Sequence, residues 1–498
     1  MGGGYRANVT RGHALALVVV AGAAIQAAGA GAGIGGVPAG AVSGRWVGGF
    51  QLGSVPTGLH VTLSQRHGHL RGTAEIGLAA PPVEEPLRRV SVHRARVTLI
   101  LPDGTLLEGR RRGSLIAGIA RAGNSRGRFE LRSIRPVALR ELRHAVGAYR
   151  LANGSVISLF VEPFGSHLRI VDYQSGEMRQ LWPVSRDAFL GGPRLLVPWP
   201  IRFRVELVRD ARRKVVGLRR NGQNADRIPL VIESAAFRNG DVRLVGKLVL
   251  PRGPGPFRAV VLVPGSERAT RDTLDLWGMF FASRGFAVLS HDKRGVGQST
   301  GRYAARPSEA NLHNLARDAL AGMHWLRTRE DIDAKRIGLT GGSQAGWTIV
   351  VAAAQSRRVA FAAIQSGAAM SVRRQRAYSA LTGSGSVVPP PSDTGIRAAL
   401  DGSPDGGFDP RPALSSVRIP LLWQLGAVDK RQYTPESVRN LRAIAAQGGH
   451  DLTVRIYPRG AHSLRETRQG LISEELRASR FVAGLFPDLA GWLATHVR

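Results

Sequence analysis

Strand-like apolar runs alternate with helical patterns through residues 257–356, and this alternation constrains the fold more than any other feature of the chain. Three runs are short and continuously apolar, as in strands buried on both faces: Phe257 to Pro264, Phe286 to Ser290 and Arg336 to Thr340. Helical patterns lie between and after them, over Thr273 to Arg284, Asn311 to Arg329 and 344–356. This order predicts a doubly wound, mostly parallel α/β sheet.

A serine between small residues lies where the third of these strands meets the next helix. Residues 341–346 read Gly-Gly-Ser-Gln-Ala-Gly. Small neighbours let the backbone turn sharply and lift a serine hydroxyl out of the sheet toward a substrate. Ser343 is therefore the candidate nucleophile. The second glycine of the usual G-x-S-x-G pattern is replaced by Ala345, and Gly346 follows one place later.

Two more candidates follow later strands. Asp429 comes after the apolar run Pro420 to Leu425, and His462 comes after Leu452 to Tyr457. Functional groups of such a sheet gather beyond the carboxyl ends of its strands, where both residues fall. His450 precedes its strand, so His462 is the better candidate.

Together these residues can carry out nucleophilic catalysis. A serine hydroxyl is a poor nucleophile at neutral pH, so His462 would take its proton and return it to the leaving group. Asp429 would fix the tautomer of His462 and stabilise its imidazolium form. We assign the donors for the oxyanion to the backbone N–H groups of Ser266 and Gln344.

Other residues near these positions have a structural and a functional interpretation. We interpret His291 to Ser299 as a tight structural loop and leave Asp292 outside the triad, because the acid is expected after a later strand. Trp277, Met279 and Trp347 are candidates for the acyl pocket, with core packing as the alternative.

Five segments in this order resemble successive blocks of the α/β-hydrolase superfamily: Val263 to Ser266, His291 to Ser299, Gly341 to Gln344, Gly426 to Asp429 and Gly460 to His462. The chain is most similar to exported bacterial serine hydrolases of the dienelactone hydrolase and prolyl-oligopeptidase-like group, over roughly residues 230–498. The resemblance implies hydrolysis of an ester, thioester or amide through an acyl-enzyme, with no metal and no organic cofactor. It does not specify the substrate.

The N-terminus predicts export. Arg6 and Arg11 precede an apolar stretch from Ala14 to Ile25, and Ala28-Gly-Ala30 follows. This is the pattern of a signal peptide over residues 1–30, for a periplasmic or extracellular protein, and an uncleaved membrane anchor is the alternative. The chain has no cysteine, which excludes disulfides, thiol catalysis and a lipid-modified cysteine.

The chain of 498 residues is long enough for more than one core. Between the signal and the α/β region, alternating apolar and polar residues with Gly and Asp-Gly turns predict antiparallel β structure. We divide it into β-rich modules over 31–139 and 140–229, ahead of a catalytic domain over 230–498. Their role in substrate capture, dimerisation, surface attachment or simple support is open. A Gly- and Pro-rich insertion at about 368–416 predicts a cap over the pocket, with an inert loop as the alternative.

The formal charge of +33 raises the question of an anionic partner. Nearly all of the positive charge is arginine, the runs of arginine are short, and few aromatic residues lie among them. We therefore expect no specific nucleic-acid binding, and at most loose electrostatic association with an anionic cell envelope.

The sequence favours an exported serine hydrolase acting on a carboxylic ester. One alternative is a peptidase, amidase or acyl thioesterase with the same triad; a peptidase would need a group such as Arg268 or Arg271 to hold the end of a peptide. The other is an inactive, envelope-associated binding protein, suggested by Ala345 and the basic β modules. The oligomeric state is open.

Overall fold

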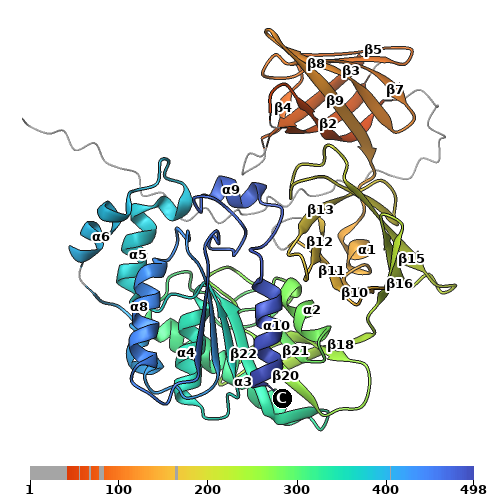
Figure 1. Ribbon diagram of the computed structural model, residues 1–498. Helices are drawn as coiled ribbons and strands as arrows, with labels where there is room; N and C mark the ends of the chain where they lie inside the picture. The colour runs from red at the N-terminus through yellow and green to blue at the C-terminus, as the bar shows by residue number, and fades with distance from the viewer. Residues whose placement is uncertain are drawn as a thin grey trace, which may run out of the picture.

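The computed structural model describes residues 42–54, 56–66, 69–77, 83–162, 167–403 and 405–497. It contains an N-terminal sheet, a closed barrel and a C-terminal α/β domain, which follow one another along the chain (Figure 1). The predicted signal peptide lies outside the described residues. The expected fold class, antiparallel β-rich modules ahead of a mostly parallel α/β sheet, is confirmed.

The N-terminal sheet has nine antiparallel strands in the order β4-β3-β2-β1-β9-β8-β7-β6-β5. They are β1 (Gly44–Gln51), β2 (Thr57–Arg66), β3 (His69–Ile76), β4 (Glu85–Pro86), β5 (Arg89–His93), β6 (Arg96–Ile100), β7 (Leu106–Arg112), β8 (Leu115–Ala122) and β9 (Ser125–Ile134). One residue in two points inward, and Trp46, Leu59 and Phe129 are among those that form its core. The apolar residues of the alternating sequence pattern therefore form the packed face of this sheet.

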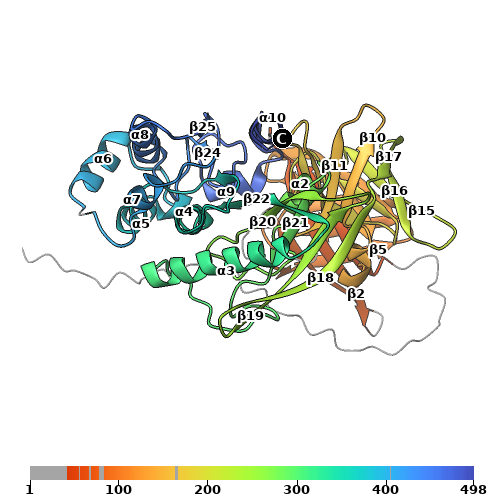
Figure 2. The ribbon, with the colours of Figure 1, turned by 90° about the horizontal axis from the view of Figure 1, so that it is seen from below.

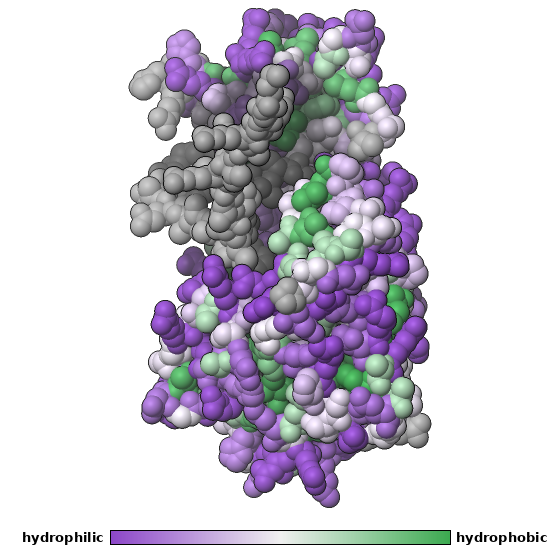
Figure 3. All heavy atoms as spheres, turned by 90° about the vertical axis from the view of Figure 1, so that its left-hand side faces the viewer, coloured by the Kyte–Doolittle hydropathy of each residue, from purple (hydrophilic) through white to green (hydrophobic). Residues whose placement is uncertain are grey.

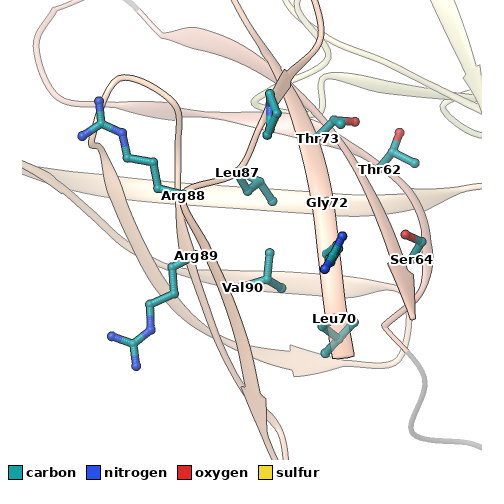
Figure 4. Close-up of a pocket in the computed structure, with 11 residues that line it drawn as sticks. Thr62, Ser64, Leu70, Gly72, Thr73, Leu87, Arg88, Arg89 and Val90 are labelled. Carbon is teal, nitrogen blue, oxygen red and sulfur yellow. The ribbon is translucent and has the colours of Figure 1, made fainter. Parts of the chain in front are cut away.

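The two edges of this sheet curl toward each other. Leu87, between β4 and β5, donates its N–H to the carbonyl of Gly72 on β3 at 2.9 Å. A cleft of about 490 Å³ lies at this seam, and its lining includes Leu70, Leu87, Val90, Arg88 and Arg89 (Figure 4). The cleft belongs to a different domain from the strands that carry the candidate triad.

The second module is a closed antiparallel barrel, preceded by the short helix α1 (Leu139–Arg143). Its strands are β10 (Gly147–Leu151), β11 (Val156–Val161), β12 (Leu168–Asp172), β13 (Met178–Pro183), β14 (Ala188–Gly191), β15 (Phe203–Arg209), β16 (Val215–Arg220) and β17 (Gln223–Arg227). Pairing of β10 with β17, with Tyr149 opposite Arg227, closes it. Closure leaves the barrel without the open edges that invite aggregation.

Two histidines and a tryptophan join the N-terminal sheet to the barrel. The indole of Trp182 on β13 makes edge contacts with the rings of His60 on β2 and of His167, at centroid distances of 4.6 and 5.3 Å. His60 also pairs with Glu75 at 3.0 Å. Burial, with a smaller effect of the neighbouring His60 and Arg169, lowers the pKa of His167 to about 4.

Acid should loosen this contact. The unfolded chain binds a proton at His167 near its ordinary pKa, whereas the folded chain binds it only near pH 4, so stability should fall as the pH drops from about 6.5 to 4. The loss is on the order of 3 kcal/mol. We expect His167→Gln to remove most of this pH dependence of stability. The measurement is the unfolding transition at the lowest urea concentration, compared at pH 7.5 and 4.5. The exposed control His144→Gln should keep it, and a dependence that persists in His167→Gln would contradict the assignment.

The C-terminal domain is built on an eight-stranded sheet in the order β18-β19-β21-β20-β22-β23-β24-β25. Its strands are β18 (Leu230–Asn239), β19 (Val242–Pro251), β20 (Phe257–Leu262), β21 (Ala287–His291), β22 (Ile332–Gly342), β23 (Ala362–Gln365), β24 (Leu421–Gly426) and β25 (Leu452–Tyr457). β19 pairs antiparallel with both β18 and β21. The remaining pairs, in the order β21-β20-β22-β23-β24-β25, are parallel. The three strands expected at 257–340 are β20, β21 and β22.

Helices cover both faces of this sheet (Figures 1 and 2). One face packs against α3 (Glu309–Arg327), α4 (Ala345–Gln355), α7 (Pro410–Leu414) and α8 (Thr434–Ala445). The other packs against α2 (Asp275–Ala282) and α10 (Leu485–His496). Because both faces are covered, the central strands are apolar on both sides, which explains the continuous runs in the sequence.

The barrel docks on the face that carries α2 and α10. The Tyr173 hydroxyl at the end of β12 donates to the carbonyl of Leu276 on α2 at 2.5 Å. Its ring meets those of Phe280 and Phe486 at 5.3 and 5.0 Å. A single apolar core therefore runs from the barrel into the C-terminal domain.

The insertion at 368–416 is folded onto the domain. It contains α5 (Val372–Leu381), the 3₁₀ turn η1 (Gly383–Gly385), α6 (Asp393–Asp401) and α7. Val372, Tyr378, Ile396 and Leu400 reach the main core. Space-filling atoms on the side that carries α5 and α6 are mostly hydrophilic, with scattered apolar residues (Figure 3).

None of the helices in the described ranges is long and apolar enough to cross a membrane.

Candidate active site

Ser343 occupies a strained turn between β22 and α4. Its φ is +57°, a left-handed conformation that residues with a side chain rarely adopt. Its N–H donates to the carbonyl of Gln365 on β23 at 2.9 Å, which fixes the turn to the sheet. Strain of this kind persists only where the surroundings impose it, and it commonly marks a functional residue.

The glycines around Ser343 account for its departure from the usual motif. A Cβ on Gly341 would meet the Val263 carbonyl at 2.2 Å and the Ala345 Cβ at 2.7 Å. A Cβ on Gly346 would meet the Gly367 Cα at 2.8 Å. The close helix approach that requires glycine therefore falls at 346, and Ala345 fits as a fully buried residue.

The structure brings Asp429 and His462 together. Asp429 follows β24 and His462 follows β25, and His462 Nδ1 lies 2.8 Å from Asp429 Oδ2. The other carboxylate oxygen, Oδ1, accepts the N–H groups of Arg431 and Gln432 at 2.7 and 3.1 Å. Nδ1 thus carries the proton in the neutral ring, and Nε2 is left as the acceptor.

Parallel pairing places Ser343 at the same edge of the sheet. Gly342, Gln365 and Gln424 are successive partners across β22, β23 and β24, so the loops that carry Ser343 and Asp429 leave the sheet together. Within the described residues no hydrogen bond joins the Ser343 hydroxyl to His462. The Asp429–His462 pair is therefore assembled, whereas the contact between Ser343 and His462 is not made.

The insertion holds the loop that carries the acid. The Tyr378 hydroxyl on α5 donates to the backbone carbonyl of Asp429 at 2.6 Å, and Gln375 Nε2 donates to that of Arg431 at 2.5 Å. Thr382 also donates to the carbonyl of Lys430. The insertion is thus a support for Asp429.

We expect Tyr378→Phe to lower the thermal stability by about 1 kcal/mol, since it leaves a buried carbonyl without its donor. Ester turnover should fall a few fold, because the loop that carries Asp429 loses the hydrogen bond that holds its backbone in place. Tyr433→Phe is the matched control: the Tyr433 ring packs against Tyr378 at 5.2 Å. Thermal unfolding and kcat/KM of both variants measure the effect, and equal behaviour would contradict this role for the hydroxyl.

Ser266 and Gln344 lie on the two segments expected to bind an oxyanion. Ser266 is in the loop between β20 and α2, and Gln344 is the residue before α4, at the positive end of the helix. Neither backbone N–H donates to another group among the described residues. Both are thus free to bind an added oxygen.

Asp292 is committed to structure, as the sequence suggested. Arg271 binds both of its oxygens, at 3.1 and 2.7 Å, and the N–H groups of Arg271 and Gln298 also donate to it. Burial acts to raise the pKa of Asp292, but these hydrogen bonds outweigh it and hold the pKa below the ordinary value. The guanidinium of Arg271 is therefore already engaged by the Asp292 carboxylate.

The three candidate pocket residues pack in cores. Trp347 is 4% exposed and donates to the Met370 carbonyl at 3.2 Å on the α4 face. Met279 and Trp277 pack on the opposite face, where Trp277 lies 5.5 Å from the ring of Phe486. These contacts agree with the core-packing alternative.

A family comparison finds a similarity within the C-terminal domain. Residues 274–487 match the prolyl oligopeptidase family. The match covers less than half of the 498-residue chain.

Individual relatives match shorter stretches. The chain is 32% identical over 103 residues to "Esterase FrsA" of Escherichia fergusonii, and 30% identical over 103 residues to that of Escherichia coli O1:K1 / APEC. The match covers 20% of this chain and 25% of each esterase, so the chain spans a quarter of the length of these relatives.

Two solved structures are also similar. The Pyrococcus furiosus esterase Pf2001 has a TM-score of 0.40 at 15% identity, over 54% of this chain and 92% of its own. The Pyrococcus horikoshii acylaminoacyl peptidase has a TM-score of 0.40 at 15% identity, over 89% of this chain and 80% of its own.

Sequence reasoning missed several residues around the candidate active site. Lys293 and Tyr303 contact the loop of Ser266, and Tyr378 contacts the loop of Asp429. A lysine two residues after a buried strand was the available signal for the first of these. Groups of three or more His, Asp or Glu side chains arranged to hold a metal do not occur among the described residues.

Proposed function

We propose that this protein is an exported serine esterase that cleaves carboxylic esters through an acyl-enzyme on Ser343, His462 and Asp429. The observation that carries the proposal is the strained Ser343, φ +57°, at the edge of the sheet where Asp429 and His462 are paired at 2.8 Å. A left-handed serine at the same sheet edge as a hydrogen-bonded Asp–His pair meets no structural need that a glycine would not meet better.

The proposed reaction has two halves. The Ser343 Oγ attacks the ester carbonyl carbon while its proton passes to His462 Nε2. Asp429 stabilises the imidazolium that forms, and collapse of the tetrahedral intermediate expels the alcohol, which takes the proton from His462. Water then attacks the acyl-enzyme with His462 again as the base, releasing the acid and restoring Ser343.

The negative oxygen of each tetrahedral intermediate would be bound by the N–H groups of Ser266 and Gln344. Both groups are without an acceptor among the described residues, and Gln344 lies at the positive end of α4. Donors fixed in advance cost no reorganisation when the charge develops.

The engagement of Arg271 removes one of the two cations that a peptidase could use near this site, which favours an ester over a peptide. A peptidase that trims a chain end needs a free cation to hold the terminal group, and Arg271 is engaged by Asp292 and Gln298. Arg268 is exposed and stacks on the Tyr303 ring at 4.6 Å. The match to the prolyl oligopeptidase family keeps a peptidase as the second candidate, with Arg268 as its terminus-binding group.

The test compares acyl substrates on the intact chain. A fluorophosphonate probe first reports whether a serine is activated. Turnover is then measured on p-nitrophenyl esters of increasing length, on acylated peptide p-nitroanilides and on acyl thioesters. Because the chain has no cysteine, a thiol reagent can follow thioester cleavage without reacting with the protein.

Labelling with a kcat/KM for esters well above that for anilides and thioesters is the expected result. A higher kcat/KM for anilides would identify a peptidase, and a higher value for thioesters an acyl thioesterase. A folded sample that is neither labelled nor active would contradict the enzyme and favour the inactive binding protein.

Export is part of the proposal and rests on residues 1–30. Arg6 and Arg11, the apolar stretch Ala14 to Ile25 and Ala28-Gly-Ala30 form the pattern of a cleaved signal. Two measurements on a C-terminally tagged chain test export. Cell fractionation shows the compartment that holds the protein, and mass spectrometry of the purified protein shows where its N-terminus begins. Full-length protein in the membrane would identify an anchor. Release of envelope-bound protein by salt would support loose electrostatic association.

A further inference from the structure

Lys293 is a buried lysine that reaches both halves of the oxyanion site. It lies two residues beyond β21, and its side chain is among the largest that are fully buried, at 1% exposed. Its Nζ donates to the Gly265 carbonyl at 2.5 Å and to Gln344 Oε1 at 3.1 Å. The first acceptor immediately precedes Ser266, and the second belongs to the residue that follows Ser343.

The bond to Gly265 sets the direction of the Ser266 N–H. The Gly265 carbonyl and the Ser266 N–H belong to one planar trans peptide, so they point in opposite directions. Holding the carbonyl toward Lys293 turns the N–H away from it. The Ser266 carbonyl is fixed as well, by the Tyr303 hydroxyl at 2.7 Å, and the Gly265 N–H by Glu267 Oε1 at 3.2 Å.

The bond to Gln344 orients the second donor segment. An ammonium only donates, so the oxygen of the Gln344 amide must face Lys293. The amide nitrogen, Nε2, is then left buried and without a partner among the described residues. Gln344 is 4% exposed, so its side chain has little freedom to turn elsewhere.

The partners of Lys293 distinguish it from Lys247, a half-buried lysine of the same domain. Lys247 lies between two carboxylates, Asp272 and Asp275, at 2.6 Å each. Lys293 donates instead to uncharged oxygens, so no carboxylate in direct contact neutralises its charge. A buried ammonium without a contacting anion is costly, and it is best explained where a negative charge forms during a reaction.

We propose that Lys293 is a positioning residue of the oxyanion site: its ammonium fixes the Gly265–Ser266 peptide and the Gln344 side chain, and its charge favours the tetrahedral oxyanion. This role rests on the proposed esterase function. Lys293 acts through the two donor segments, so its removal should weaken binding of the transition state more than binding of the substrate.

The test compares Lys293→Met with the wild type and with Lys335→Met. Lys335 is exposed near the opposite end of β22 from Ser343. We expect Lys293→Met to lower kcat for p-nitrophenyl esters about 10²-fold with KM changed less than about threefold, and to slow fluorophosphonate labelling of Ser343 to a similar extent. Lys335→Met should match the wild type.

The pH dependence separates this role from a purely structural one. Burial lowers the pKa of Lys293 to about 8, against the opposing effect of Glu267 and Asp318; His291 and the Tyr303 phenol also face it. The ammonium is the active form, so wild-type kcat/KM should fall as the pH rises through about 8. Lys293→Arg should move this fall upward, toward the pKa of a guanidinium.

Each outcome decides between the two proposals. If the wild type is not labelled, the esterase proposal fails. If the wild type is labelled but folded Lys293→Met keeps its kcat, or loses activity only through KM, the role of Lys293 fails. Should Lys293→Met not fold, an alkaline fall that stays near pH 8 in Lys293→Arg would overturn the proposal, and one that moves upward would support it.

Discussion

Replacing Ser343 by alanine is expected to abolish fluorophosphonate labelling and to lower kcat on p-nitrophenyl esters by about 10⁵-fold or more. The variant removes the atom that we propose forms the acyl bond and leaves its surroundings in place. Residual turnover should reflect only substrate binding and the donors of Ser266 and Gln344. Alanine at φ +57° keeps the backbone strain of the serine, so the thermal stability should change little.

Ser366 provides the matched control for this experiment. It also has a positive φ, +48°, at the end of the neighbouring strand β23, and it is 3% exposed with a hydroxyl that has no partner among the described residues. Ser366→Ala should be labelled and active. If labelling survives in Ser343→Ala and disappears in Ser366→Ala, the nucleophile has been misassigned.

Asp429→Asn is expected to lower kcat by about 10³ to 10⁴-fold, because it forces the wrong tautomer on His462. The Asp429 Oδ1 accepts two backbone N–H groups, so the carbonyl of the asparagine must take that position. The amide NH₂ then faces His462 Nδ1, which can only accept. The ring must carry its proton on Nε2, where it cannot receive one from Ser343.

A second Asp–His pair serves as the control. Asp451 lies 3.5 Å from His496 and is exposed just before β25, at the other end of the strand from the loop of His462. Asp451→Asn should leave kcat and its pH dependence unchanged. Loss of folding in Asp429→Asn would show as a lower unfolding temperature, whereas the tautomer effect lowers kcat in a folded protein. Full activity of folded Asp429→Asn would contradict its role.

The parts of the site that follow regular strands were predictable from the sequence. The strands β20, β21 and β24 and the C-terminal half of β22 are mostly apolar, and β25 carries apolar residues among polar ones. Ser343, Asp429 and His462 follow β22, β24 and β25. Chain order and the geometry of parallel sheets were then enough to bring the three loops to one edge.

Residues that act through long-range contacts were not predictable in the same way. Lys293 was interpreted as part of a tight loop, because no local pattern shows that its side chain turns inward to Gly265 and Gln344. Tyr378 lies in an insertion whose composition suggested a cap, and its bond to the Asp429 carbonyl joins segments 51 residues apart. Closure of the barrel likewise depends on the pairing of β10 with β17, which are distant in the chain.

The aromatic contact between the barrel and α2 determines how this protein can be divided. Tyr173, Phe280 and Phe486 form one cluster across the boundary between two sheets, and the Tyr173 hydroxyl has its acceptor on the far side. A chain that began at Leu230 would expose this apolar surface to water and leave α2 and α10 uncovered. The barrel and the C-terminal sheet therefore share one apolar core, so a substitution on either side of the boundary changes the packing of both.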